Sequence, residues 1–597
     1  MKKNVIFLLI DCFDYNKIGA NEFRPSPTPF LDELKHKTLW AERMYSHAPY
    51  TEAALIATIC GYDTLDYGGH LKRYKNCPET LYEMMHNAGY EVYAQMWTHF
   101  YPSSALKGID IPKLRPYSFK TLWYYRFEYY SGLYVNNQME DADYRDLEDI
   151  IRDNFIHWKQ YLIMLENHDE RIEMIDRYMI LPDMKDNISK LQNEINIFDT
   201  NPRMYIESIF QQGLNHKIFE IFDDECLNNK VDPEFVKKIH EKYNYLNKYL
   251  YDFGNKLNRQ NNHLSFRKMW QYYKGGGYSL NLNKRTQISQ YLRNYWHVTH
   301  DTHLLGKFKE NYPDQKDCIT ARSMMELFLD WQDKRNEQAK PYFAYIHCDD
   351  IHGQSEIFNV CSTVESEIDD QVKELSLFLK NIKKNYRGNL AYDLGLISID
   401  RQVKWFYGEL EKRGLLENSI FIITADHGCG TNYYPLRGMI QNFHDECYHI
   451  PFIICGNCVK PKVDTNYHMT KDIMPTIADL VDAKLPNSAT GISLFSKKER
   501  KIVIQEYMGP GCPDMYRREA WMCAFDDEWK LFIKVKLNKE KGFDYKIEEI
   551  FNRRQDPLEL DNRKWNKKDV RECDYLFKAL EVRWKEIISN YSRDGKY

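Results

Sequence analysis

The sequence predicts an α/β fold: a mostly parallel sheet sandwiched by helices, with a large helical insertion and a smaller C-terminal antiparallel subdomain. Three observations predict it. The apolar run at residues 4–11 shows no polar alternation, as expected for a strand covered on both faces. Strand and helix patterns alternate on either side of residues 120–335. From residue 501 onward, strand patterns follow one another directly, which is typical of an antiparallel unit.

The N-terminal elements follow in order within residues 1–119. Pro29 starts a helix after the first strand, a position that suits its fixed backbone angle. A second helix, rich in small side chains, is expected at 51–60 and is closed by a glycine. The amphipathic stretch 81–88 leads into a strand at 90–94. This alternation predicts parallel strands joined by helices.

The middle of the chain, residues 120–335, is rich in Tyr, Trp, Asn, Lys and Glu and predicts a mostly helical insertion. Its aromatic side chains could stack on sugar rings or on a partner, although an aromatic helical core is the commoner arrangement. Alternation resumes over 336–500, which together with 1–119 forms the predicted catalytic α/β domain. The elements expected there are strands at 342–346, 419–424 and 451–455 and a helix at 393–411. Residues 501–597 form the C-terminal subdomain, with expected strands at 502–506, 521–525 and 529–535 and a closing helix at 570–589.

Charge, hydropathy and cysteine usage narrow the function classes. The 597 residues carry a net charge of −5 with interspersed signs, so we expect no nucleic-acid partner. No apolar run is long enough to span a bilayer, and the first one ends at Asp11 without a cleavage site, which indicates a strand rather than a signal peptide. The 14 cysteines are scattered, and the C-x-x-C pair Cys455 and Cys458 is a minor candidate for redox or metal chemistry. These features together predict a cytoplasmic protein.

Four residues with the chemistry of a metal-activated nucleophile occur beside predicted strand ends and a helix start. Asp11 ends the first strand, Asp426 and His427 follow a later one, and Thr51 begins the small-residue helix. Because the carboxyl ends of parallel strands meet at one edge of a sheet, we expect these groups to converge. Together they could hold a divalent ion that lowers the pKa of the hydroxyl, while the helix N-terminus stabilises an oxyanion.

A second polar cluster follows the strand expected at 342–346. His352 could bind a phosphoryl oxygen or protonate a leaving group, and Asp350 could bind metal or orient His352. Each of these residues alone also has an ordinary structural interpretation, since Asp and Thr often cap helices and His-rich turns often lie at the surface. Their joint occurrence at successive strand ends favours the functional interpretation.

Ordered motifs at both ends of the chain resemble the sulfatase branch of the alkaline-phosphatase superfamily. The run 4–11 resembles the family's opening strand with its metal-binding Asp, 28–34 resembles TPFLDxL, and 345–352 resembles YVHxxDPH. Further segments resemble the DxxVG…TSDHG, YEExxRVPLII and ELYDLxxDPxExxNL stretches of the family, at 400–428, 443–454 and 549–562. The resemblance implies an alkaline-phosphatase/sulfatase-like fold and an enzyme that acts on phosphate or sulfate esters.

The nucleophile position departs from the sulfatase pattern. Sulfatases carry C/S-x-P-x-R, whose Cys or Ser is oxidised to formylglycine, whereas this chain reads Thr51-Glu-Ala-Ala-Leu and cannot form that group. Cys12 stands where the family has a second Asp, and no Lys accompanies His99 in the segment that resembles GKWHLG. The threonine instead resembles phosphoryl-transferring relatives: phosphodiesterases, phosphopentomutases, and phosphoethanolamine or phosphoglycerol transferases.

The resemblance also implies a mechanism and a set of site residues. Thr51 would attack phosphorus and form a phospho-threonine intermediate that water or an acceptor hydroxyl resolves. One divalent ion (Mn, Zn, Mg or Ca) would be held by Asp11, Thr51, Asp426 and His427, with a second ion as the alternative. His352 would assist the leaving group. The further substrate-binding candidates are His99, His444, His449 and Arg437.

These expectations define one leading function and two alternatives. The leading function is a metal-dependent hydrolase or transferase of phosphate esters or diesters, with a small-molecule or glycan substrate. Hydrolysis of sulfate esters is the first alternative. A catalytically silent binding protein is the second, because the basic contacts of the family are missing.

Overall fold

The computed structural model describes most of the chain, with gaps that fall chiefly in the insertion. The described residues are 2–68, 77–97, 107–115, 130–131, 133–167, 179–180, 185–218, 230–231, 321–336, 339–352, 367–383, 390–429, 443–508, 519–537, 543–557, 559 and 561–590. Among these residues, no helix combines the length and the apolar character needed to cross a membrane.

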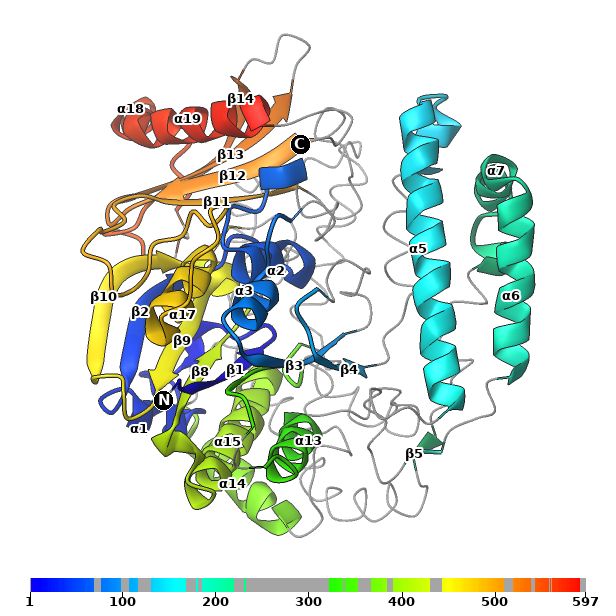
Figure 1. Ribbon diagram of the computed structural model, residues 1–597. Helices are drawn as coiled ribbons and strands as arrows, with labels where there is room; N and C mark the ends of the chain where they lie inside the picture. Colours follow the sequence, from blue (N-terminus) through cyan, green and yellow to red (C-terminus); the bar gives the residue numbers. More distant parts are fainter. Residues whose placement is uncertain are drawn as a thin grey trace.

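A mixed, mostly parallel sheet forms the centre of the molecule (Figure 1), which confirms the predicted fold class. Its strand order is β10-β2-β9-β8-β1-β7-β3-β4, and within it β9 runs antiparallel to both of its neighbours. Strands β2, β4 and β10 were not expected from the sequence, because their partly exposed, charge-bearing stretches lack the long apolar runs of central strands. The bounds are β1 Asn4–Ile10, β2 Leu39–Tyr45, β3 Glu91–Trp97, β4 Ile111–Arg115, β7 Tyr342–Cys348, β8 Ser419–Thr424, β9 His449–Cys455 and β10 Lys462–Met469.

Helices cover both faces of this sheet, as the unbroken apolar character of its central strands requires. Residues 5–10 of β1 are fully buried between β7 and β8. Figure 1 shows α1, α13, α14 and α15 on one face and α2, α3 and α17 on the other. Their bounds are α1 Pro29–Leu34, α2 Thr51–Cys60, α3 Leu81–Asn87, α13 Ala321–Asp333, α14 Ile368–Asn381, α15 Leu390–Lys412 and α17 Ile473–Val481, with the short α16 at Asp445–Tyr448.

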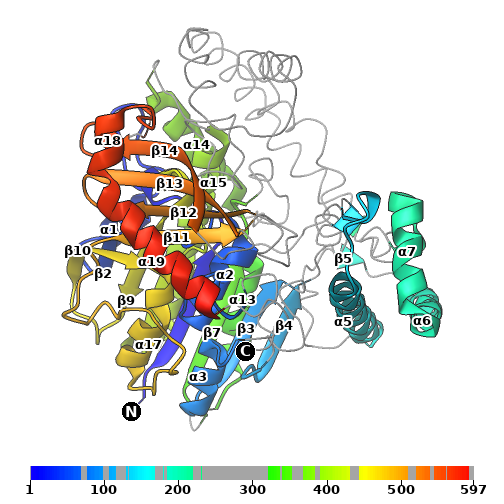
Figure 2. The same cartoon turned by 90° about the horizontal axis from the view of Figure 1, so that it is seen from above.

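The C-terminal part forms the expected antiparallel sheet, with two helices after it (Figure 2). Alternate residues of β12 point to opposite faces: Met522 and Ala524 pack towards α19, whereas Cys523 and Phe525 join a cluster with Ala53 of α2. The small sheet therefore supports the helix that begins at Thr51. Its elements are β11 Val503–Met508, β12 Glu519–Phe525, β13 Trp529–Leu537, β14 Phe543–Asn552, α18 Lys567–Glu572 and α19 Asp574–Asn590.

Part of the predicted insertion is helical where the structure describes it. Helices α5, α6 and α7 lie to one side of the main sheet in both views (Figures 1 and 2). Within the range 120–335, however, α13 packs on β7 and shares its core through Met324 and Phe328. The remaining described elements of this range are α5 Asp141–Glu166, α6 Lys185–Thr200, α7 Pro202–Gln212 and the strand pair β5 Met179–Ile180 and β6 Lys230–Val231.

Candidate metal centre and nucleophile

The carboxyl ends of three adjacent parallel strands bring the candidate ligands together. Asp11 directly follows β1, and its backbone N–H donates to the Cys348 carbonyl at 2.8 Å, which extends the pairing of β1 with β7. In the same register, Leu9 of β1 lies beside His347 of β7 on one side and beside Thr424 of β8 on the other. Asp426 lies two residues beyond that end of β8. The expected convergence at this sheet edge is therefore present.

Thr51 reaches this edge from the first turn of α2. Its hydroxyl Oγ1 lies 3.2 Å from Asp11 Oδ2 and 3.2 Å from His427 Nε2. The neighbouring Ala53 and Ala54 are completely buried against the C-terminal sheet, which fixes the start of the helix. The hydroxyl is thus held between a carboxylate and an imidazole, with helical backbone N–H groups beside it.

The two carboxylates present oxygen atoms that lack hydrogen-bond partners among the described residues. Asp426 Oδ1 accepts from the backbone N–H groups of Cys12 at 3.2 Å and His427 at 2.7 Å. Asp426 Oδ2 and Asp11 Oδ1 are buried and accept no hydrogen bond from the described part of the chain. Leaving such charged acceptors unsatisfied costs free energy, so the donor set fits a bound cation.

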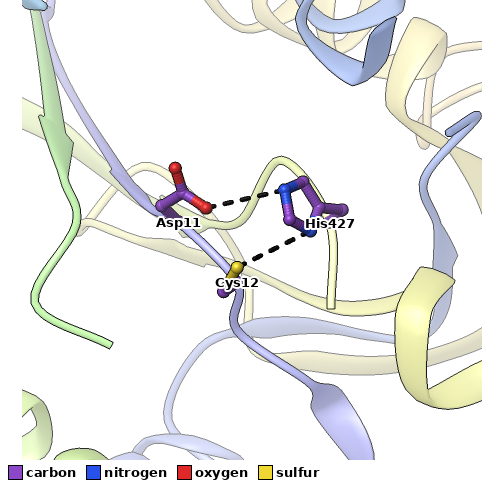
Figure 3. A group of neighbouring side chains, drawn as sticks. All are labelled: Asp11, Cys12 and His427. Atoms are coloured by element: carbon purple, nitrogen blue, oxygen red, sulfur yellow. Dashed lines mark hydrogen bonds and ion pairs between the residues drawn. The ribbon is translucent and has the colours of Figure 1, made fainter. Parts of the chain in front are cut away.

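His427 faces Asp11 and Cys12 with opposite sides of its ring (Figure 3), and the adjacent Gly428 carbonyl orients the ring. Its Nδ1 lies 2.7 Å from the Gly428 carbonyl oxygen, which can only accept, so Nδ1 carries the hydrogen. This leaves Nε2 facing Asp11 Oδ1 at 3.6 Å and Asp426 Oδ2 at 3.4 Å. Cys12 Sγ lies on the opposite, Nδ1 side of the ring, at 3.8 Å.

The electrostatics of the two carboxylates differ although they share a site. Burial alone would raise the pKa of Asp11, but the nearby imidazoles of His352, His347 and His427 lower it well below its ordinary value. The pKa of Asp426 is instead raised, first by burial and then by the Asp11 charge. One carboxylate thus stays ionised and makes ionisation of the other less favourable, a repulsion that a divalent cation would relieve.

The end of β7 and the turn after it contain two predicted site residues, Asp350 and His352, and one residue, His347, to which no role was assigned. His352 is exposed, and it lies near enough to Asp11 to lower the pKa of that carboxyl. Asp350 accepts a hydrogen bond from the Ala321 backbone N–H at 2.7 Å, so it satisfies the first turn of α13. His347 is completely buried, with Nε2 at 3.5 Å from Asp11 Oδ2. The polar residue at the end of an otherwise apolar strand was the signal that could have identified His347.

Two of the further substrate-binding candidates lie in other interaction networks. His444 Nδ1 forms an ion-pair contact with Glu559 at 2.9 Å, in the region where the C-terminal sheet meets α16. His449 is stacked between two tyrosine rings, and its Nε2 lies 2.7 Å from the Glu42 carbonyl. His99 and Arg437 lie outside the described residues. Substrate binding by these four residues stays a prediction.

The C-x-x-C pair and the motif residue Asp400 have separate positions. Cys455 is buried at the end of β9, where burial raises the pKa of its thiol to about 12, and Cys458 is exposed; both are free thiols. Asp400 accepts from the backbone N–H groups of Phe30 at 2.9 Å and Leu31 at 3.0 Å. It therefore caps α1 and fixes that helix on α15 rather than taking part in the site.

Comparisons with known proteins match one family model and parts of two curated proteins. The sulfatase family model matches residues 3–169 and 234–483. An arylsulfatase of Clostridium perfringens is 28% identical over 214 residues, covering 34% of this chain and 40% of that protein. The delta 4,5-hexuronate-2-O-sulfatase of Bacteroides thetaiotaomicron is 28% identical over 137 residues, covering 21% of this chain and 28% of that protein. The chain thus spans less than half the length of either curated relative.

Solved structures add a likeness at low identity. The phosphonate monoester hydrolase of Agrobacterium radiobacter is 12% identical, with 98% of this chain and 96% of that chain covered and a TM-score of 0.47. The family assignment depends instead on the family match, which extends over more than half of the sequence and includes Asp11, Thr51, Asp426 and His427. The chain belongs to the sulfatase family, within the alkaline-phosphatase-like superfamily.

Proposed function

We propose that the protein is a metal-dependent hydrolase or transferase of phosphate esters that uses Thr51 as its nucleophile. The observation that carries the proposal is the position of Thr51 Oγ1, 3.2 Å from both Asp11 Oδ2 and His427 Nε2 at the start of α2. A threonine cannot be converted to formylglycine, so a hydroxyl is the reacting group at this position. Hydroxyl nucleophiles that attack phosphorus form phosphoester intermediates, which water or a second hydroxyl can resolve.

The residues of the site suit both halves of such a reaction. Asp11 Oδ2, 3.2 Å from Thr51 Oγ1, is placed to accept the Thr51 proton, whereas His427 Nε2 would hold the ion. The bond from Thr51 Oγ1 to phosphorus would form as the bond to the leaving oxygen breaks, with His352 donating a proton to that oxygen. In the second half, water or an acceptor hydroxyl would attack phosphorus, break the bond to Oγ1 and restore the threonine.

A divalent ion fits the buried acceptors at this sheet edge. Asp11, Asp426, His427 and Thr51 would hold it, since Asp11 Oδ1 and Asp426 Oδ2 have no hydrogen-bond partner among the described residues. When bound, the ion would lower the pKa of the hydroxyl and polarise a substrate oxygen. The N–H groups in the first turn of α2 would add positive potential for the transferring oxyanion.

Hydrolysis of sulfate esters is the second candidate. Family membership favours it, as do the two curated relatives whose names describe sulfatases. Those relatives also support a glycan ester as the substrate class, since one of them is named for a sulfated hexuronate. Thr51 argues against sulfate-ester hydrolysis, because a threonine cannot be converted to the formylglycine that sulfatases use.

The test compares two isosteric substitutions on the same helix. Thr51→Val removes the proposed nucleophile, whereas the matched control Thr58→Val removes a buried hydroxyl that only donates to the Ala54 carbonyl at 3.2 Å. Aryl phosphate, bis-aryl phosphate and aryl sulfate are assayed with Mn²⁺ or Zn²⁺. We expect Thr51→Val to reduce phosphate turnover on the order of 10⁴-fold, comparable to removing one member of a catalytic group, and Thr58→Val to reduce it less than tenfold.

Three results would contradict the proposal. Phosphate turnover that survives Thr51→Val would exclude this hydroxyl as the nucleophile. Sulfate turnover that exceeds phosphate turnover by orders of magnitude would favour the sulfatase candidate. Absence of both activities, together with absence of bound metal in the purified protein, would favour a silent binding protein. Mass spectrometry of a quenched reaction would locate the phosphoryl group on Thr51 in the supporting case.

A further inference from the structure

His347 lies beside the carboxylates of Asp11 and Asp426, at the end of β7. Its side chain is completely buried at the end of β7, and its Nε2 lies 3.5 Å from Asp11 Oδ2. Asp11, His347 and Asp426 each offer one ligand atom, and these three atoms lie within 4.8 Å of one another. We propose that His347 is an additional metal ligand, and that the site consequently prefers Zn²⁺ or a similar transition-metal ion over Mg²⁺ and Ca²⁺. This inference rests on the metal site of the proposed function.

Both histidines of the site have the hydrogen-bonding arrangement of metal ligands. Ligating histidines use one ring nitrogen for the metal and hold the other with an outer partner. His427 has the Gly428 carbonyl at 2.7 Å from Nδ1, and His347 has the Tyr345 hydroxyl at 3.5 Å from Nδ1. In each ring this leaves Nε2 on the side of the carboxylates. The two imidazoles thus present equivalent nitrogens to the space beside Asp11 and Asp426.

The thiol of Cys12 is a competing ligand that the geometry disfavours. Asp11, Cys12 and His427 also offer ligand atoms within 4.8 Å of one another. Cys12 Sγ, however, approaches His427 from the Nδ1 side (Figure 3), and the Gly428 carbonyl oxygen already lies 2.7 Å from Nδ1. The ligand set is therefore nitrogen and oxygen only.

Such a ligand set has a definite metal preference. Mg²⁺ and Ca²⁺ select oxygen ligands almost entirely, and Ca²⁺ takes six to eight of them. Imidazole nitrogens suit Zn²⁺ and other transition metals, and two of them beside two carboxylates and one hydroxyl make a mixed set of the kind these ions accept. The second imidazole is what moves the preference, because a site with His427 alone is dominated by oxygen.

The experiment measures metal binding rather than turnover. Zn²⁺, Co²⁺ and Ca²⁺ affinities of the full-length apoprotein are determined by calorimetry for wild type, His347→Ala, His347→Gln and the control His468→Gln. His468 is a buried imidazole on β10 that pairs with Asp464 at 3.3 Å. His468→Gln therefore removes a buried imidazole beside a carboxylate, as His347→Gln does, but away from the proposed metal site. We expect both His347 variants to lose more Zn²⁺ affinity than the roughly 10–100-fold typical of an outer-sphere partner, with Ca²⁺ affinity nearly unchanged. His468→Gln should match wild type.

A measurement on wild type alone keeps the inference testable if the variants misfold. X-ray absorption of the Zn²⁺-loaded protein counts imidazole ligands, and we expect two. One imidazole, a sulfur ligand, Zn²⁺ affinity retained in His347→Gln, or no Zn²⁺ binding by wild type would each overturn the inference. The proposed function fails separately: two imidazoles on zinc without phosphate turnover would reject phosphate chemistry and retain His347 as a ligand. Phosphate turnover by a protein whose zinc has one imidazole ligand would retain phosphate chemistry and reject His347 as a ligand.

Discussion

Two polar clusters in this molecule both contain carboxylates and an imidazole, and they differ in how their charges are balanced. The strand-end cluster at Asp11, Asp426 and His427 brings carboxylates and imidazole together without any Lys or Arg among its contacts in the described residues. The Lys530 cluster, at the junction of the C-terminal sheet with α16, contains Lys530, Arg553, His444, Asp445 and Glu559. There Lys530 Nζ lies 2.8 Å from Asp445 and 2.7 Å from Glu559.

The difference distinguishes buried charges that stabilise the fold from buried charges that a bound ligand would balance. In the Lys530 cluster each carboxylate faces a cation, so its desolvation cost is offset within the protein. In the strand-end cluster burial and the Asp11 charge raise the pKa of Asp426, and one oxygen atom of each carboxylate stays without a hydrogen-bond partner among the described residues. Unbalanced negative charge at this sheet edge therefore supports the proposed cation site, whereas the balanced charges of the Lys530 cluster stabilise the junction of the C-terminal sheet with α16.

The largest expected effect comes from unbalancing the Lys530 cluster. Lys530→Met leaves Asp445 and Glu559 buried without the ammonium that holds them, and loss of one partner of a buried ion pair costs about 3–5 kcal/mol. We expect the free energy of unfolding, measured by urea denaturation, to fall by that amount. The control Lys536→Met changes an exposed lysine on the same strand and should shift it by less than about 0.5 kcal/mol. Equal effects of the two changes would refute the assignment of Lys530 as a structural cation.

A smaller effect is expected where the two clusters meet, at Gly428. Its N–H donates to the Cys447 carbonyl at 2.8 Å, and a Cβ at this position would overlap the Glu446 carbonyl oxygen. Gly428→Ala must therefore displace α16 or His427, and we expect about 1–3 kcal/mol of destabilisation together with weaker Zn²⁺ binding. Gly408→Ala is the matched control in α15, where an added Cβ meets nothing within 4 Å. That change should stabilise the protein by about 0.5–1 kcal/mol. Unchanged Zn²⁺ affinity in Gly428→Ala would show that a displacement at α16 does not affect the strand-end cluster.

The sequence predicted the parts of the molecule that depend on local pattern and on strand order. Residues 4–10 show an unbroken apolar run, and the carboxyl-end rule then placed Asp11 and Asp426 at one edge. Thr51 was predicted at the start of a helix because small residues follow it and Gly61 closes the helix. These inferences need only neighbours in the chain and the handedness of α/β connections.

The sequence could not predict contacts that depend on which distant segment fills a space. His444 and His449 flank a predicted strand, as catalytic residues do, but their partners come from β14, β2 and a loop more than 100 residues away. Asp350 follows a strand like Asp11, yet the start of α13 takes its carboxylate. His347 opens the polar cluster expected after residue 346, but the sequence assigned it no role, because its neighbour Asp11 lies far away along the chain.

The smallest expected effect concerns His449. It tests whether this residue stabilises the fold, like the Lys530 cluster, or binds substrate. Burial lowers the pKa of His449 to about 4 from an ordinary value of 6.5, so the folded protein holds the ring neutral while the unfolded chain protonates it. The unfolded state thus binds more protons between these pH values, and His449 contributes stability above pH 6.5 that is lost as the pH falls towards 4.

His449→Phe keeps the stacking against Tyr15 and Tyr45 but does not titrate. We expect the slope of unfolding free energy with pH in this window to be lower than in wild type by up to about 1.4 kcal/mol per pH unit, with kcat/KM changed less than about twofold. An unchanged slope combined with a large loss of kcat/KM would instead place His449 in substrate binding, as the sequence predicted.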